Sequence, residues 1–313
     1  ITHSYFRDID RNAFNSINEI TSNAKFVIQN NIFETNDEDN CFMERCYIRS
    51  GGLMQVEGNS FLGGRLFSPY YQTEIYDADS KFIYTDNISI NKSDISVTID
   101  ISDDFIPNED MVIIRNNQFN YVTNVNSPAV ISLNGGGKGY FLFKGNTLDG
   151  TNLSIGNALS ARVQDNTIKN SYGISLSNTN ALLERDTLIN NKGSGVSVYT
   201  SFDYQHTVKD TIRYCLITGN NTSNSSSYAG IFIQGYSNPV IHNNNIFDNQ
   251  NYDIRTESPH NEIDARYNWW GSTTTAEMDL GGNPKDLSAF YDYFDDNTLE
   301  KINYAGWLAE QDG

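Results

Sequence analysis

The chain is poor in the residues that staple small domains or bind structural metals. Its 313 residues include only three cysteines, too few for a disulfide framework, although Cys41 and Cys46 are close enough to pair if the loop between them bends back. There is no CxxC pair, and the four histidines do not have the spacing of metal ligands. We therefore expect neither a disulfide scaffold nor a structural zinc site.

Basic charge and long apolar runs are also scarce. The chain has 21 basic and 39 acidic residues, a net charge of −18, so nucleic acid, whose phosphates require a basic surface, is excluded as an expected partner. Without a run of about 18 apolar residues, no membrane insertion is expected. The first ten residues, ITHSYFRDID, lack the features of a signal peptide, which we expect to have been removed or to lie upstream.

Proline is rare as well, with 6 residues, whereas glycine, asparagine and serine are abundant and aromatic residues make up 12% of the chain. A disordered segment would lack these aromatic residues. The composition instead favours many short strands joined by tight polar turns.

A repeat with spacings of 20 to 30 residues organises most of the chain. Segments such as FVIQNNIF, MQVEGNSF, VIIRNNQF and PVIHNNNI align on one asparagine column. The column consists of Asn31, Asn59, Asn87, Asn117, Asn146, Asn166, Asp186, Cys215, Asn244 and Asn268. Ten recurrences of one pattern predict about ten copies of one structural unit.

The positions around this column alternate as in a strand with one buried face. Three residues before the column the chain is always apolar or aromatic, as at Ile28, Val56 and Tyr84. Two residues after it the chain is apolar in every copy except at Ser89. The column therefore marks a bend between two short strands.

One such unit cannot bury its apolar side chains alone, but stacked copies enclose a continuous core and pair their strands in parallel. Asparagine tolerates the unusual backbone of a sharp turn, and stacked asparagine amides can hydrogen-bond along a ladder at a spacing of about 4.8 Å. We therefore predict an all-β solenoid with an asparagine ladder.

The pattern Φ-x-Φ-x-x-N-x-Φ resembles the parallel β-helix repeat of the pectate-lyase-like superfamily. The ending DARYNWWG, with the DLSAFYDYF segment after it, resembles the close of many secreted bacterial β-helix repeat proteins. The resemblance covers roughly residues 24–272 as repeats and implies a right-handed, single-stranded coil with three parallel sheets, secreted or displayed on the cell surface. It says little about chemistry, because this scaffold hosts lyases, hydrolases, epimerases, tailspikes and adhesins.

We divide the chain into β-helix turns over 1–272 and a C-terminal capping segment over 273–313, which lacks the column and carries apolar residues that can cover the open strand edges. The N-terminus offers no comparable cap. We therefore expect the coil to continue upstream, as part of a longer chain.

In the superfamily that the sequence resembles, active sites usually lie on the outer face of the first sheet. Alternation along that sheet places mostly serine and threonine outward, and its charged candidates for catalysis are Asp100, Asp253 and Arg255. A lyase acting on acidic sugars needs a base and a cation, and a hydrolase needs two carboxylates, so these residues are weak candidates for either reaction. The motif sets of polygalacturonases and alginate epimerases are absent as sets.

Acidic loops raise the alternative of Ca²⁺ binding, with Asp103 and Asp104 as the candidate ligands, although neither belongs to a regular Ca²⁺ loop motif. Solvated surface charge explains the same residues. No other cofactor is indicated.

Aromatic residues outside the core columns suggest a polysaccharide partner. Tyr199, Phe232 and Tyr236 lie at outward strand or loop positions, where exposed rings can stack on sugar rings. Packing of these rings against the coil is the alternative. The sequence thus leaves three functions open: a polysaccharide-binding or adhesive module, a polysaccharide lyase or glycoside hydrolase with an atypical site, and a purely structural module.

Overall fold

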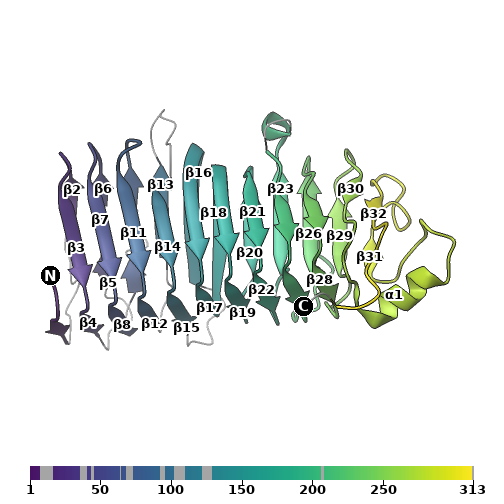
Figure 1. The fold of residues 1–313 in the computed structure, drawn as a ribbon, viewed down its shortest axis with the longest axis horizontal. Helices are drawn as coiled ribbons and strands as arrows, with labels where there is room; N and C mark the ends of the chain where they lie inside the picture. Colours follow the sequence, from purple (N-terminus) through teal and green to yellow (C-terminus); the bar gives the residue numbers. More distant parts are fainter. Residues whose placement is uncertain are drawn as a thin grey trace. The chain divides into compact units, whose positions relative to one another are not determined.

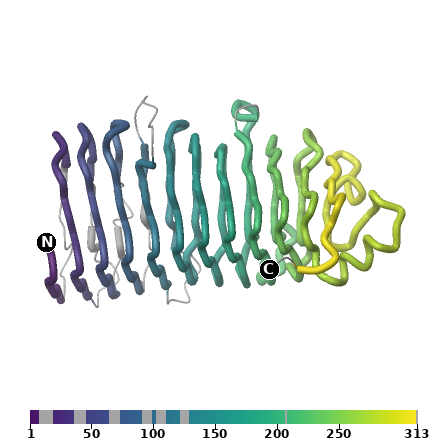
Figure 2. Tube along the Cα trace, viewed as in Figure 1, coloured from purple at the N-terminus to yellow at the C-terminus, as the bar shows by residue number. Residues whose placement is uncertain are grey.

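The computed structural model describes residues 1–7, 17–35, 41–43, 46–63, 65–67, 73–91, 96–101, 110–121, 129–205 and 208–311. The chain forms two compact units, Ile1–Arg162 and Val163–Gly313. Each unit is a coil in which successive turns lie side by side and contribute short parallel strands to the same sheets (Figures 1 and 2). Strand β18 (Thr151–Gln164) carries the chain from the first unit into the second.

Three stacks of parallel strands build the first unit. The first stack contains β2 (Ile17–Ile20), β6 (Cys46–Ile48), β10 (Thr73–Ile75), β13 (Ser96–Ile101) and the beginning of β16 (Ala129–Lys144). The second contains β3 (Lys25–Gln29), β7 (Leu53–Glu57), β11 (Lys81–Thr85), β14 (Val112–Arg115) and the end of β16. The third contains β1 (Tyr5–Phe6), β4 (Ile32–Glu34), β8 (Ser60–Gly63), β12 (Ile88–Asn91), β15 (Gln118–Tyr121) and β17 (Thr147–Asp149). A separate pair, β5 (Cys41–Met43) and β9 (Arg65–Phe67), lies outside these stacks.

The second unit repeats the same three stacks. The first consists of β20 (Ile174–Ser177), β23 (Val196–Thr200), β26 (Ile231–Gly235), β29 (Ile254–Glu257) and β31 (Phe290–Tyr291). The second consists of β21 (Ala181–Glu184), β24 (Thr211–Arg213), β27 (Val240–His242), β30 (Ile263–Asp264) and β32 (Ile302–Asn303). The third consists of β19 (Thr167–Lys169), β22 (Thr187–Ile189), β25 (Leu216–Thr218) and β28 (Asn245–Phe247). The parallel β-helix expected from the repeat is confirmed.

The asparagine ladder is also confirmed within each unit. Asn117 is typical: its side-chain nitrogen donates to Asn146 Oδ1 at 2.9 Å and to the Tyr84 carbonyl at 2.9 Å, while its Oδ1 accepts the Asn87 side-chain nitrogen at 3.1 Å. Each ladder residue thus binds backbone and side-chain groups of the neighbouring turns, so the buried polar atoms of the bend are satisfied.

The left-handed backbone of the bend, however, belongs to the residue before the ladder position. Asn30, Asn116 and Asn243 have φ of 56°, and Asp86 and Tyr214 have nearly the same value. The expectation that the ladder asparagine itself adopts the unusual turn conformation was wrong. Asparagine recurs at the ladder position because its amide hydrogen-bonds to the neighbouring turns, and the residue before it adopts the left-handed conformation. The preceding position tolerates several residue types at a cost in strain.

A second ladder, which the sequence analysis missed, lies at the next bend of the second unit. It runs through Ser171, Asn191, Asn220 and Asn249, with Asn191 Nδ2 donating to Asn220 Oδ1 at 2.8 Å and Asn220 Nδ2 to Asn249 Oδ1 at 2.9 Å. Asp253 closes it, since its Oδ1 accepts Asn249 Nδ2 at 2.9 Å. Every member stands five residues after a member of the first ladder, apart from the closing aspartate.

The core consists of inward-facing side chains stacked from turn to turn. Phe6, Phe33 and Phe61 stack with centroid distances of 4.9 and 5.1 Å. Burying each phenylalanine contributes about 1.5–3 kcal/mol. At the far end of the second unit, Trp270 packs on Phe290 at 4.6 Å, directly before helix α1 (Gly271–Asp279).

The described residues bear on two expectations from the sequence, a disulfide between Cys41 and Cys46 and the lack of a membrane-spanning segment. The Cys46 thiol is free and buried, so it forms no disulfide with Cys41. Within the part of the chain that the structure describes, no helix has the length and apolarity needed to cross a membrane.

Candidate functional site

The outward face of the first stack carries serine in one part of the second unit and aromatic and charged residues in another. Ser175 pairs in register with Ser197, which pairs with Phe232, and the column continues through Arg255 to Tyr291. The structure therefore confirms Arg255 as an outward residue of the predicted stripe.

Arg255 is held in place by two rings and two hydrogen-bond acceptors, while its buried Nε has no hydrogen-bond partner among the described residues. Its guanidinium lies 4.3 Å from the centroid of the Tyr291 ring and 5.7 Å from that of Phe232. It also donates to the Ser226 carbonyl and to Glu257 Oε1, each at 2.6 Å. Since the guanidinium is stacked between two rings and paired with Glu257, it acts here as a packing and positioning group.

Asp253 was wrongly placed beside Arg255 on the outer face. The side chain is buried, with 4% exposure, because β29 begins only at Ile254 and the bend before it breaks the alternation. Burial raises the pKa of Asp253 to about 7, although the hydrogen bonds from Asn249 oppose the shift. Its carboxylate completes the second ladder and faces no open surface, so we assign it no catalytic role.

For Phe232 the structure shows the second of the two alternatives, packing of the ring against the coil. Phe232 points outward from β26 but is only 6% exposed. Arg255 lies over its ring, and the loop that supplies Ser226 is pinned by Asn221, whose side-chain nitrogen donates to the Ser225 and Tyr228 carbonyls at 2.9 and 3.2 Å. A sugar cannot stack on this ring while these contacts persist.

Asp100 lies in a small acidic pair that the sequence analysis did not find. It is in register with Glu74 on one side and with Asn134 on the other. Partial burial is the main cause that raises the pKa of Asp100; a hydrogen bond from Asn134 lowers it, and the Glu74 charge raises it further. Neighbouring strands lie about 4.8 Å apart, so the register brings two carboxylates into adjacent positions.

The proposed Ca²⁺ ligands Asp103 and Asp104 lie outside the described residues. Among the residues that the structure does describe, no group of three or more His, Cys, Asp or Glu side chains has an arrangement that could hold a metal ion.

An open aromatic feature of the second unit is a group of four rings that we call the aromatic shelf: Tyr199, Phe202, Tyr236 and His260. Phe202 lies in the short 3-10 helix η1 (Phe202–Tyr204), in the loop at the upper end of β23 in Figure 1, and is 64% exposed. Tyr199, near the end of β23, is 45% exposed. The shelf therefore presents apolar ring surface to the solvent.

Three successive turns contribute to the shelf at equivalent places, shortly after β23, β26 and β29 end. The Tyr236 ring stacks flat on His260, with centroids 3.9 Å apart and 3° between planes, and Phe202 meets Tyr236 edge-on at 5.5 Å. Such contacts fix the ring orientations without ligand. The backbone nitrogen of Tyr236 donates to the Thr200 carbonyl at 2.8 Å, which joins two of these turns.

A polar column borders the shelf. Ser177, Tyr199, Gln234 and Glu257 pair in register across β20, β23, β26 and β29. Gln234 Nε2 donates to Glu257 Oε2 at 3.3 Å, and the other carboxylate oxygen of Glu257 accepts from Arg255. Hydroxyl, amide and carboxylate groups thus stand next to exposed rings, an arrangement that can bind the hydroxyls and the apolar face of a sugar together.

Of the three carbohydrate-binding candidates, Tyr199 and Tyr236 belong to the shelf and Phe232 does not. Phe202 and His260 were missed, although each follows a predicted strand end within a few residues, a signal that loop position could have supplied.

The comparison with protein families agrees with this architecture. Residues 151–269 match the family model described as a right-handed β-helix region. The chain is a right-handed parallel β-helix. Searches of curated proteins and of solved structures return no match. The matched residues include β20, β23, β26 and β29 and the four rings of the shelf.

Proposed function

We propose that the chain is a polysaccharide-binding β-helix module that acts outside the cell and holds its polymer on the aromatic shelf. The observation that carries the proposal is the row of rings from three successive turns, beside a column of hydroxyl, amide and carboxylate groups. The exposed rings of Tyr199, Phe202 and His260 offer stacking surfaces, and the repeat of the coil spaces the turns that carry them along one direction, as an extended polymer requires.

The charge of the chain favours a neutral polysaccharide. With a net charge of −18, the protein repels polyanions at low ionic strength, and the polar column beside the shelf contains Glu257. Placement in the pectate-lyase-like superfamily of secreted bacterial proteins is part of this proposal, supported by the repeat and by the ending DARYNWWG.

Affinity electrophoresis in gels containing single polysaccharides tests this function. We expect migration to be retarded by at least one neutral polysaccharide and less by uronate polymers of similar length. Unchanged migration in neutral gels, with retardation in polyuronate gels alone, would show that the shelf does not bind as proposed.

A second function, hydrolysis of a glycosidic bond in the first unit, is favoured by the Glu74–Asp100 pair. Retaining glycosidases hold two carboxylates about 5–5.5 Å apart, and the raised pKa of Asp100 is the property of a general acid. Release of reducing sugar from a neutral polysaccharide, lost in both Asp100→Asn and Glu74→Gln, would support hydrolysis. Equal release by the wild type and both variants would exclude these residues.

A further inference from the structure

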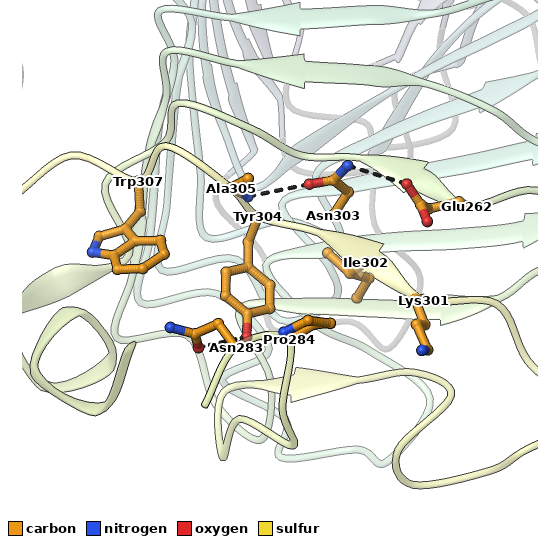
Figure 3. Close-up of a pocket in the computed structure, with 9 residues that line it drawn as sticks. All are labelled: Glu262, Asn283, Pro284, Lys301, Ile302, Asn303, Tyr304, Ala305 and Trp307. Carbon is orange, nitrogen blue, oxygen red and sulfur yellow. Dashed lines mark hydrogen bonds between the residues drawn. The ribbon is translucent and has the colours of Figure 1, made fainter. Parts of the chain in front are cut away.

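A separate cavity of about 310 Å³ lies in the C-terminal segment of the second unit (Figure 3). Its walls come from the β30–β32 region and from the loop that follows α1, with Glu262, Asn283, Lys301, Asn303, Tyr304 and Trp307 as the residues relevant to binding. Functional pockets range from about 300 to 1,000 Å³, so this cavity matches a ligand of one ring rather than a polymer segment.

The aromatic side of this cavity is fixed before any ligand binds. The buried Tyr304 hydroxyl donates to Asn283 Oδ1 at 2.8 Å and accepts the Lys285 backbone N–H at 3.0 Å. Trp307 donates from Nε1 to Asp279 Oδ1 at 3.1 Å, which anchors the half-buried indole. Because these hydrogen bonds already orient both rings, a ligand can stack on the half-buried Trp307 indole with little loss of side-chain entropy, while the buried Tyr304 ring supports the cavity wall.

The other side of the cavity carries one charge of each sign. Figure 3 shows the two rings on one side of the view and the Glu262 carboxylate and Lys301 ammonium on the other. Glu262 Oε1 accepts Asn303 Nδ2 at 3.1 Å, and a carboxylate has further acceptor sites. The Lys301 ammonium lies 4.9 Å from the centroid of the Tyr293 ring, which positions it without a carboxylate partner among the described residues.

We propose that this cavity binds a neutral sugar ring. Sugar hydroxyls both donate and accept, so they can donate to Glu262 and accept from Lys301, while the apolar face of the ring lies on Trp307. Glu262 and Lys301 offset each other inside the cavity, so the net charge of −18 on the whole chain is what disfavours an anionic sugar. The site consists of residues other than those of the aromatic shelf, and its binding does not depend on the shelf.

The test follows the indole N–H resonance of Trp307 in the ¹⁵N-labelled full chain, assigned by its absence in Trp307→Phe. D-glucose, D-galactose, D-mannose and D-glucuronate are titrated separately. The proposal predicts a saturable shift with at least one neutral sugar and a dissociation constant at least about 10-fold higher for glucuronate. It is overturned if no neutral sugar shifts the resonance, or if glucuronate binds as tightly as the best neutral sugar.

Variants separate the cavity from the shelf and from general charge effects. Glu262→Gln removes the charged acceptor and should raise the dissociation constant about 10-fold, whereas Glu310→Gln makes the same charge change outside the cavity lining and should leave it unchanged. Phe202→Ala, which alters the shelf, should also leave it unchanged. Equal binding by Glu262→Gln and the wild type, or weakened binding in Phe202→Ala, would refute the assignment.

Discussion

The hydroxyl of Tyr84 lies 3.1 Å from the hydroxyl of Ser89, and both side chains are buried in the core of the first unit. Ser89 stands two residues after the ladder position, where the other copies of the repeat have an apolar residue. Tyr84 stands three residues before the ladder position and is the residue there that carries a hydroxyl. The Tyr84 ring also packs near Phe61 and Phe119, at 6.3 and 5.8 Å, so it occupies space that a larger residue at 89 would fill. The two exceptions in the repeat therefore form one compensating pair.

A double-mutant cycle tests this pairing. Tyr84→Phe leaves the buried Ser89 hydroxyl without its partner and should lower the free energy of unfolding by about 1–3 kcal/mol. Ser89→Ala should do the same for Tyr84, and the double variant should lose less than the sum of the two. Urea denaturation measures all three, and strictly additive losses would mean that the hydroxyls do not interact.

Replacing the ladder residue Asn117 should destabilise the protein more than replacing Tyr84 or Ser89. Asn117→Ala removes the acceptor of the Asn87 N–H groups and the donor to the Tyr84 carbonyl, so several buried polar groups lose partners at once. We expect the free energy of unfolding to fall by about 3 kcal/mol or more. Asn120→Ala, on β15 outside the ladder, is the matched control and should change it by less than about 0.5 kcal/mol.

In the second unit, the first ladder contains a titratable residue, Asp186, which makes the stability of the protein depend on pH. Asp186 Oδ1 accepts Asn166 Nδ2 at 2.8 Å, but Asp186 Oδ2 has no hydrogen-bond partner among the described residues, and the next turn has Cys215 at the ladder position. Burial raises the pKa of Asp186 to about 8. Burial likewise raises the pKa of Asp210 to about 7. These groups keep their protons in the folded state at pH values where the unfolded chain has lost them.

The sign of the pH effect follows from this difference. Below about pH 4 both states are protonated, and between about pH 4 and 8 the folded state binds more protons, so stability falls as the pH rises. Asp186→Asn has no carboxyl group to titrate, so it removes the part of the stability loss that Asp186 causes. The change that it makes to the free energy of unfolding should be more favourable at pH 8 than at pH 5 by on the order of 2–4 kcal/mol. Thermal denaturation across this range measures it, and an equal effect at both pH values would show that Asp186 does not titrate as inferred.

The sequence predicted the parts of the fold that depend on local repetition. Asn59, Asn87 and Asn117 were correctly placed in one ladder because each bend repeats the same side-chain bonds to the next turn. The second ladder was missed because its spacing becomes clear only after the first ladder has defined the bends. Asn191, Asn220 and Asn249 are then each found five residues later.

The candidate site was less predictable, because exposure depends on what covers a residue. Alternation gave the right direction for Phe232, but Arg255 and the neighbouring loop cover its ring. Alternation failed for Asp253 because the strand starts one residue later. Glu74 meets Asp100 only through the register of two turns, which the sequence does not specify across loops of unequal length.

Binding of a neutral polysaccharide on the shelf is the central claim, and matched ring variants test it most directly. Affinity electrophoresis compares the wild type with Phe202→Ala and Tyr199→Ala, and with Tyr172→Ala as an exposed tyrosine outside the shelf. Loss of one stacking ring costs about 1 kcal/mol, so the dissociation constant should rise about 5-fold in each shelf variant and stay unchanged in Tyr172→Ala. Equal retardation of all four proteins would contradict the claim.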